Sequence, residues 1–125
     1  GCRVMQQLIG VIDDSYLPQI TFELKDHFSK LIEDKNGNHV IQKLIDRLQP
    51  GENNGIYDVV LKDILKLSKH KYGCRVIQTL LKQCNKEQVA KMLDEIYKEV
   101  KELSEDQYGN YIIQYILEKR NEKNV

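Results

Sequence analysis

The 125-residue chain lacks tryptophan, a net charge and any long apolar run, and each absence limits what it can be. Basic and acidic side chains number 19 each, so a nucleic-acid partner has to be argued from particular side chains rather than from overall charge. No segment approaches the length of a membrane span or resembles a signal peptide. The chain starts inside a repeated string, so we expect further sequence upstream of residue 1.

Cysteine is also scarce, with three residues in total. An odd count without paired spacing argues against a disulfide framework and suits a reducing compartment. His70 and Cys74 are four residues apart, but no second pair accompanies them to complete a zinc site. Cys74 likewise has no recurring histidine and carboxylate that would make it a nucleophile, and Cys84 is expected in the core. We therefore expect no metal, no cofactor and no enzymatic activity.

What the chain does contain is a repeat. The strings GCRVMQ, GNHVIQ, GCRVIQ and GNYIIQ begin at glycines spaced 36 residues apart: Gly1, Gly37, Gly73 and Gly109. A fixed period between 20 and 50 residues is the signature of a repeat architecture. The prediction is a single array over residues 1–125, with a partial repeat at 1–15 followed by repeats at 16–51, 52–87 and 88–123.

Apolar periodicity predicts that every unit is helical. Ile20, Leu24, Phe28 and Leu31 are spaced by four, four and three residues, and apolar residues recur at these positions one and two periods later. This spacing indicates an amphipathic helix, and a second helix is expected to begin near each periodic glycine. Each unit has apolar surface that it cannot bury alone, so the units must stack. The fold class is therefore an all-α solenoid.

Three polar positions recur on the second helix of each unit, outside the apolar arc. The first is cysteine or asparagine, the second is always planar, and the third, one helical turn after the first, is always glutamine. The four triplets are Cys2, Arg3 and Gln6; Asn38, His39 and Gln42; Cys74, Arg75 and Gln78; and Asn110, Tyr111 and Gln114. A face that merely contacts solvent needs no such constancy.

The triplets fit the geometry of a nucleic-acid strand. Stacked helices lie about 8–10 Å apart, whereas stacked bases are about 3.4 Å apart, so bases bound one per unit leave gaps. Planar side chains (Arg3, His39, Arg75, Tyr111) can fill those gaps by stacking. The flanking pair would then meet a base edge, since glutamine offers a donor and an acceptor, asparagine a second amide and cysteine a small, nearly apolar surface.

The strings YGCRVIQ, NGNHVIQK and YGNYIIQY at this period resemble the Pumilio (PUF) family of RNA-binding repeats, and the resemblance covers the whole chain. It implies a right-handed crescent of three-helix repeats, of which this chain matches the central repeats of a typical eight-repeat array. It also implies single-stranded RNA on the concave face, one base per repeat. By the family's code, Cys2–Gln6 and Cys74–Gln78 read adenine, and Asn38–Gln42 and Asn110–Gln114 read uracil. Antiparallel RNA then gives 5′-UAUA-3′, part of a UGUANAUA-like element.

The resemblance further implies a cytoplasmic regulator that binds mRNA 3′ untranslated regions. It would act in translational regulation and mRNA decay, with repressor or deadenylation proteins on the convex face and neither a membrane nor a small-molecule substrate as partner. No triplet of the Ser/Glu type that reads guanine is present, so we expect a fragment of a larger crescent.

Two alternatives stay open at this stage. The chain could be a protein–protein interaction scaffold, or a low-specificity binder of structured RNA of the nucleolar Pumilio-like type. Lys43, Arg47 and Lys82 lie on or near the second helices, where phosphate contacts or plain solvation would both explain them.

Overall fold

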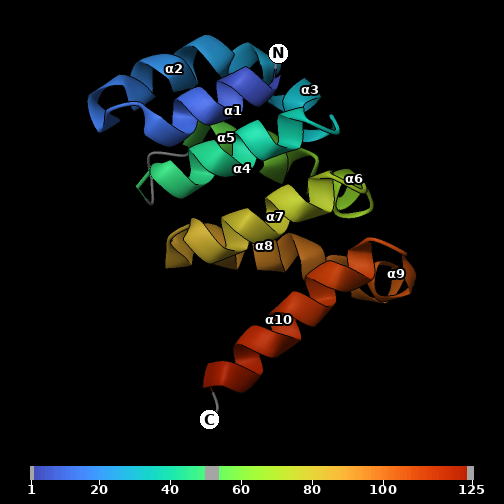
Figure 1. The fold of residues 1–125 in the computed structure, drawn as a ribbon. Helices are drawn as coiled ribbons and strands as arrows, with labels where there is room; N and C mark the ends of the chain where they lie inside the picture. Colours follow the sequence, from blue (N-terminus) through green and yellow to red (C-terminus); the bar gives the residue numbers. More distant parts are fainter. Residues whose placement is uncertain (1, 50–53, 124–125) are drawn as a thin grey trace.

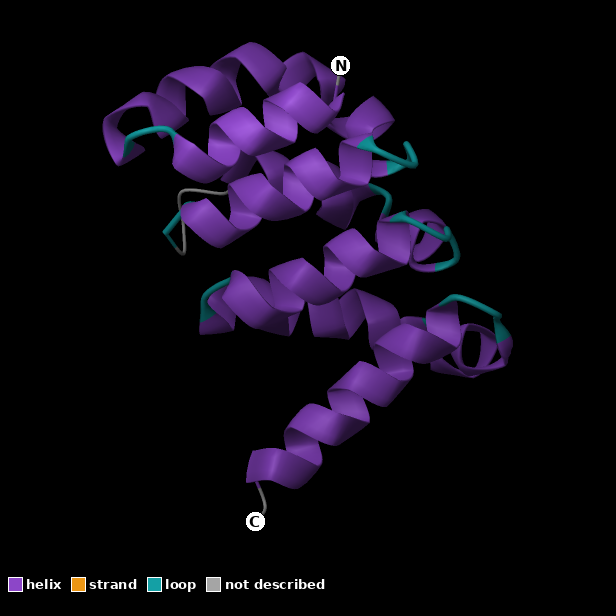
Figure 2. Cartoon of the chain, in the orientation of Figure 1, coloured by secondary structure: helices purple, strands orange, loops and turns teal. Residues whose placement is uncertain are grey.

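The computed structural model describes residues 2–49 and 54–123, and every regular element in these ranges is helical (Figure 2). In chain order the elements are α1 (Cys2–Val11), η1 (Asp14–Tyr16), α2 (Leu17–Leu24), η2 (Lys25–His27), α3 (Phe28–Ile32), α4 (Gly37–Arg47), α5 (Asn54–Lys62), α6 (Ile64–Ser68), α7 (Gly73–Gln83), α8 (Lys86–Lys98), α9 (Val100–Glu105) and α10 (Gly109–Lys123). The all-α prediction is confirmed. Over the same ranges, no helix combines the length and apolarity that crossing a bilayer requires.

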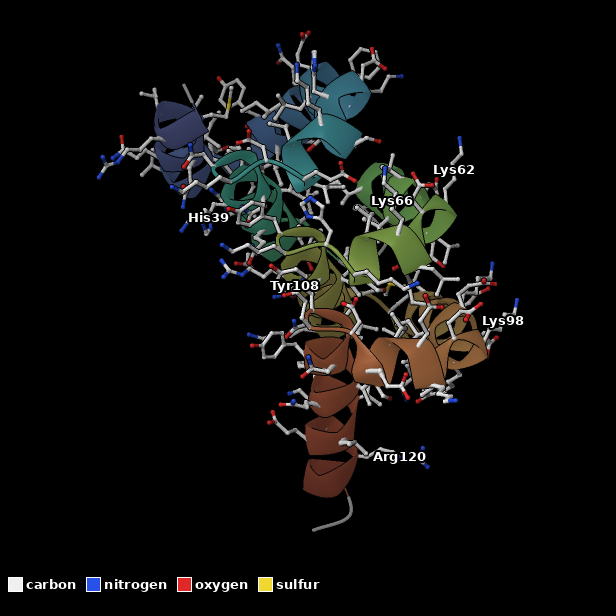
Figure 3. The ribbon with its side chains drawn as sticks, turned by 90° about the vertical axis from the view of Figure 1, so that its right-hand side faces the viewer. His39, Lys62, Lys66, Lys98, Tyr108 and Arg120 are labelled. Atoms are coloured by element: carbon white, nitrogen blue, oxygen red, sulfur yellow. The ribbon has the colours of Figure 1, made fainter. Side chains whose placement is uncertain are left out.

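The helices form two layers that run the length of the molecule. Helices α1, α4, α7 and α10 follow one another down the stack, each in contact with the next (Figure 1). The remaining helices make the second layer, which the side view separates clearly from the first (Figure 3). We call α1, α4, α7 and α10 the recognition helices because they carry the four triplets.

A continuous apolar core lies between the layers and joins one unit to the next. Each interior recognition helix contributes its apolar arc, and the second layer contributes the facing side chains. The fully buried members include Val40, Ile41, Leu44 and Ile45 of α4, Val76, Ile77 and Leu80 of α7, and Phe28, Ile32, Ile56, Met92, Ile96 and Leu103 of the second layer. Because these side chains pack across unit boundaries, the units depend on one another for burial.

Each full unit contains three helices, as the family resemblance implied, so the reading of the apolar ladder as one amphipathic helix before each recognition helix is wrong. The apolar ladder is divided between two shorter helices, with the break at Asp63 (φ −117°, ψ 30°) and one period later at Glu99 (φ −123°, ψ 31°). In the first full unit the 3₁₀ turn η2 makes the same division. No glycine or proline marks these bends, so local propensity did not reveal them. The bends turn the chain so that Leu31, Leu67 and Leu103 reach the starts of the recognition helices.

The periodic glycines are explained by that close approach. A Cβ atom at Gly37, Gly73 or Gly109 would lie 2.8, 2.7 or 2.8 Å from the backbone oxygen of the leucine six residues earlier. Side-chain carbons do not approach a carbonyl oxygen so closely without displacing the backbone. Glycine therefore recurs every 36 residues because the recognition helix starts against the backbone of the preceding short helix.

A capping box starts α8: Gln88 N donates to Asn85 Oδ1 (2.9 Å), and Asn85 N donates to Gln88 Oε1 (3.3 Å). Cys84 is half-buried and packs against the edge of the core.

Candidate nucleic-acid interface

Each of the helices α4, α7 and α10 begins beside a side chain that caps its first amides. Asp34 Oδ2 accepts from the backbone nitrogens of Asn36 (2.8 Å) and Gly37 (2.7 Å), and Asp106 Oδ2 makes the equivalent pair of bonds two repeats later. In the unit between them His70 replaces the aspartate: its Nδ1 accepts from the amides of the tyrosine and glycine that follow, at 3.1 Å each. Sequence reasoning gave His70 no role beyond an incomplete metal pair, although its position 36 residues after Asp34 was the available signal.

Capping also favours the charged form of Asp34. The amide of Gly37, followed by that of Asn36, holds the pKa of Asp34 below its ordinary value. A carboxylate that accepts backbone hydrogen bonds is stabilised in its charged form, so Asp34 remains an acceptor at neutral pH. The start of α4 is thereby fixed in the conformation that presents its triplet.

The planar member of every triplet is exposed. Arg3, His39, Arg75 and Tyr111 all lie on the outer side of the recognition helices, and Figure 3 shows His39 on the opposite side of the molecule from Lys62 and Lys98. The guanidinium of Arg75 lies 6.0 Å from the centre of the Tyr72 ring, at the outer limit of a cation–π contact. These side chains are free to stack on a flat ligand.

Hollows lie beside the triplets, between neighbouring recognition helices. One of about 530 Å³ separates α7 from α10 and is lined by residues that include Cys74, Arg75, Gln78, Tyr111 and Gln114. Another of about 570 Å³ lies between α1 and α4, lined by Arg3, Gln6 and Lys43 among others. The described triplet side chains on α1, α7 and α10 thus lie beside two hollows, one between α1 and α4 and one between α7 and α10.

The two asparagine triplets share one hydrogen-bond pattern. Asn38 is completely buried (0% exposed), and its Nδ2 donates to the backbone oxygens of Asp34 (2.9 Å) and Lys35 (2.8 Å). Its Oδ1 accepts from Nε2 of Gln42 at 2.9 Å. Asn110 repeats this arrangement with the oxygens of Asp106 (2.7 Å) and Gln107 (2.9 Å) and with Nε2 of Gln114 (2.8 Å).

The cysteine triplet at α7 is built differently. Cys74 is 3% exposed, its thiol donates to the backbone oxygen of Lys71 (3.4 Å), and Gln78 Nε2 donates to the backbone oxygen of Cys74 (3.3 Å). Burial raises the pKa of the Cys74 thiol, so it stays protonated at neutral pH and is a poor nucleophile. Cys2 lies in α1, but its side chain is outside the described part of the structure.

One contact between units was not foreseen. The hydroxyl of Thr79 on α7 lies 3.3 Å from Oε1 of Gln42 on α4 and 3.0 Å from the backbone oxygen of Arg75. Thr79 directly follows Gln78, at the position that Lys43 and Tyr115 occupy in neighbouring units. Lys43 and Tyr115 line the same hollows as the glutamines of the units before them, Gln6 and Gln78.

The three basic side chains considered for phosphate contacts lie in three different environments. Lys43 lines the hollow between α1 and α4. Lys82 borders an apolar groove of about 330 Å³ with Leu81 and Leu93, away from the triplets. Arg47 joins α4 to the end of α1, because its guanidinium donates to the backbone oxygens of Ile9 (2.6 Å) and Ile12 (2.8 Å) and pairs with Asp14. Of the three, Lys43 alone lies beside a triplet.

Comparison with known proteins places this arrangement in a family. A model of the Pumilio-family RNA binding repeat matches residues 1–24, 27–61, 63–97 and 99–125. The chain belongs to the Pumilio family. The matched segments are offset from the repeat bounds predicted above, as expected when a periodic array is divided at a different point of its period.

Individual relatives agree with this assignment. Over 63 residues the chain is 36% identical to a protein of Arabidopsis thaliana described as pumilio homolog 7, chloroplastic, which covers 50% of this chain and 10% of that protein. The solved Puf4 RNA binding domain, bound to an HO endonuclease RNA 3′ UTR recognition sequence, is 35% identical with a TM-score of 0.91, covering 98% of this chain and 38% of that one. The Puf3 domain bound to Cox17 RNA is 41% identical with a TM-score of 0.88, covering 93% and 34%. The predicted right-handed α-solenoid of Pumilio-type repeats is confirmed, and the chain spans well under half the length of these relatives.

Proposed function

We propose that the chain binds single-stranded RNA sequence-specifically, one base per unit. The observation that carries this proposal is the alignment of four triplets on the four recognition helices, each with an exposed planar side chain beside a glutamine. A planar group at every step supplies stacking at about 1–3 kcal/mol per base. An amide at every step supplies a donor and an acceptor for a base edge.

The sequence 5′-UAUA-3′ is the proposed target, with the first base at the triplet of α10 and the last at that of α1. Support comes from the family to which the chain belongs, since the Puf4 and Puf3 domains are solved in complex with 3′ UTR recognition sequences. The proposal extends to a cytoplasmic, non-catalytic role in mRNA regulation through 3′ untranslated regions, with repressor or deadenylation proteins as further partners.

The direct test is a change of specificity in the interior unit at α7. The double variant Cys74→Ser, Gln78→Glu replaces the adenine-type pair with the guanine-type pair. Wild type and variant are titrated against one longer RNA that carries either 5′-UAUA-3′ or 5′-UGUA-3′. We expect preference at the second base to move from adenine to guanine by about tenfold or more, since a good bidentate pair discriminates by about 1–3 kcal/mol.

As a matched control, the third base of the RNA is substituted instead of the second. That base faces Asn38 and Gln42, so the substitution should change the affinities of wild type and variant equally. Thermal unfolding of the variant checks that the buried Cys74 position tolerates serine. If wild type and variant bind every RNA alike, the triplets do not read bases, and the protein-scaffold alternative replaces this proposal.

A further inference from the structure

The start of α7 differs from the starts of α4 and α10 in the chemical group that caps it. Asp34 and Asp106 each accept two backbone amides with a carboxylate oxygen. His70 stands at the equivalent position and accepts the amides of Tyr72 and Gly73 with its ring nitrogen Nδ1, at 3.1 Å each. Backbone N–H groups only donate, so this Nδ1 carries no hydrogen and the proton of the neutral ring lies on Nε2. The cap of α7 therefore depends on a neutral imidazole.

A protonated His70 cannot keep these two bonds. The charged ring has a hydrogen on both nitrogens, so Nδ1 becomes a donor that faces two other donors. The positive charge also lies at the start of an 11-residue helix, where the helix dipole favours negative charge. Histidine ordinarily changes charge between about pH 5 and 8. Asp34 remains an acceptor through that range, because the amides of Gly37 and Asn36 hold its pKa below its ordinary value.

The carboxylates that approach this end of the unit from neighbouring elements are already engaged. Glu33 of α3 pairs with Lys66, and Glu102 of α9 pairs with Lys69. Asp106, whose charge acts on the thiol of Cys74, accepts the first amides of α10.

The other charged and titratable groups at this point come from the same unit as His70. The ring of Tyr72 lies 5.8 Å from the ring of His70, and the cationic groups of Lys71 and Arg75 lie 5.6 and 6.0 Å from the centre of the Tyr72 ring. Within the described residues, neither cation pairs with a carboxylate. Burial keeps the Cys74 thiol neutral by raising its pKa. A charged His70 would therefore add a third cation to two that are uncompensated.

We propose that base recognition at α7 depends on pH. Protonation of His70 releases the amides of Tyr72 and Gly73 and loosens the start of α7, while α4 and α10 keep their aspartate caps. The path to the triplet is short, because Cys74 and Arg75 directly follow Gly73 and Arg75 N donates to the backbone oxygen of Tyr72 (3.1 Å). This inference rests on the proposed function and concerns the second base of 5′-UAUA-3′. Affinity for that base is highest at neutral pH and falls as the solution becomes acidic.

The variant His70→Asp gives α7 the cap of its neighbours and is the matched comparison. Wild type and variant are titrated against a longer RNA carrying 5′-UAUA-3′ or 5′-UUUA-3′ at about pH 7.5 and about pH 5.5, toward either end of the range in which histidine titrates. We expect acidification to cost wild type about fivefold more affinity for UAUA than it costs the variant, the effect of one lost helix cap. Wild type should also lose part of its preference for adenine at the second base. His27 and His39 are present in both proteins, so their own effects cancel in the comparison.

A second measurement uses wild type without RNA and does not depend on the proposed function. In isotope-labelled protein, nitrogen spectra show which ring nitrogen of His70 carries the proton, and amide spectra follow the starts of the helices as the pH is lowered. We expect the proton on Nε2 at neutral pH. The amide signals of Tyr72 and Gly73 should then move together with the titration of the ring, while those of Asn36 and Gly37 stay constant.

The outcomes separate this inference from the proposed function. Equal pH dependence of RNA binding in wild type and His70→Asp, or amides that do not follow the ring, would overturn the inference and leave RNA binding intact. Failure of wild type to bind either RNA at neutral pH would instead remove the proposed function and the base-reading part of this inference. The amide signals of the free protein would still decide whether His70 is a pH-sensitive cap.

Discussion

Tyr57 on α5 carries a buried hydroxyl group that lowers the stability of the fold. The side chain is buried (6% exposed), and within the described residues its hydroxyl has no hydrogen-bond partner. Burial, with smaller contributions from Cys84, Asp58 and Glu87, raises the pKa of this phenol. A buried polar group without a partner costs about 1–3 kcal/mol.

The substitution Tyr57→Phe removes that hydroxyl and keeps the ring. We expect the free energy of unfolding, measured by urea titration, to rise by about 1 kcal/mol. Tyr97→Phe is the control, because Tyr97 is exposed and its change should stay within about 0.5 kcal/mol. A destabilised Tyr57→Phe protein would mean that the hydroxyl has a partner, such as a bound water, and would contradict this account.

At the residue scale, the sequence predicted which positions form the triplets, because those positions repeat. It did not predict the hydrogen-bond partners of individual side chains. The period alone identified all four triplets as one aligned set. It could not show that the Asn38 amide nitrogen donates to the two backbone oxygens of Asp34 and Lys35. An asparagine's hydrogen bonds depend on the geometry of the backbone around it rather than on residue type. It also did not reveal His70 as a cap, because the equivalent residues Asp34 and Asp106 belong to a different side-chain class.

At the scale of the element, the start of each recognition helix is fixed by contact with the short helix before it. The apolar ladder predicted helical structure correctly but not the bends at Asp63 and Glu99. Those bends bring Leu67 and Leu103 against the following glycines, which is a contact between elements. Periodicity within one element carries no information about such a contact.

The substitution Gly73→Ala tests that packing. The new Cβ would lie 2.7 Å from the backbone oxygen of Leu67, which cannot move away as a flexible side chain could. We expect a loss of about 1–3 kcal/mol in the free energy of unfolding, typical of overpacking.

Gly10→Ala on α1 provides the matched control for this substitution. Its Cβ would meet only the terminal Cε of Lys43 at 3.3 Å, and Lys43 is free to move. Since alanine favours a helix by about 0.5–1 kcal/mol over glycine, Gly10→Ala should be neutral or stabilising. Equal effects of the two alanines in thermal or urea unfolding would show that helix propensity, rather than the leucine contact, governs these positions.

At the scale of the whole molecule, the balance of 19 basic and 19 acidic side chains shapes the proposed interaction with RNA. Binding by stacking and base edges releases few counterions, whereas a basic protein that grips phosphates releases many. Arg47 is already engaged in holding α4 to the end of α1, which reduces the cations available to a strand.

We therefore expect a shallow dependence of RNA affinity on salt. Each phosphate contact to a single strand contributes about −0.7 to the slope of log affinity against log salt concentration. With no more than two or three such contacts, the slope for a UAUA-containing RNA should be shallower than about −2. Titrations between 50 and 200 mM salt, about the range over which basic binders lose most affinity, would measure it. A steep slope shared by unrelated sequences would favour the low-specificity alternative.

Several hydrogen bonds and ion pairs that join the described units span similar distances along the chain. Arg47 reaches Ile9, Thr79 reaches Gln42 and Gln83 reaches Asp46 across 37 or 38 residues, and Lys69 pairs with Glu102 across 33. Each of these contacts closes a loop of about one repeat, so no distant parts of the chain have to meet before stability is gained. The entropy cost of closing loops of this length is modest. Folding can then start at any pair of adjacent units and spread outward in either direction. The order in which units form is set by their local stability, so a substitution in an interior unit should slow folding more than the same change at α1.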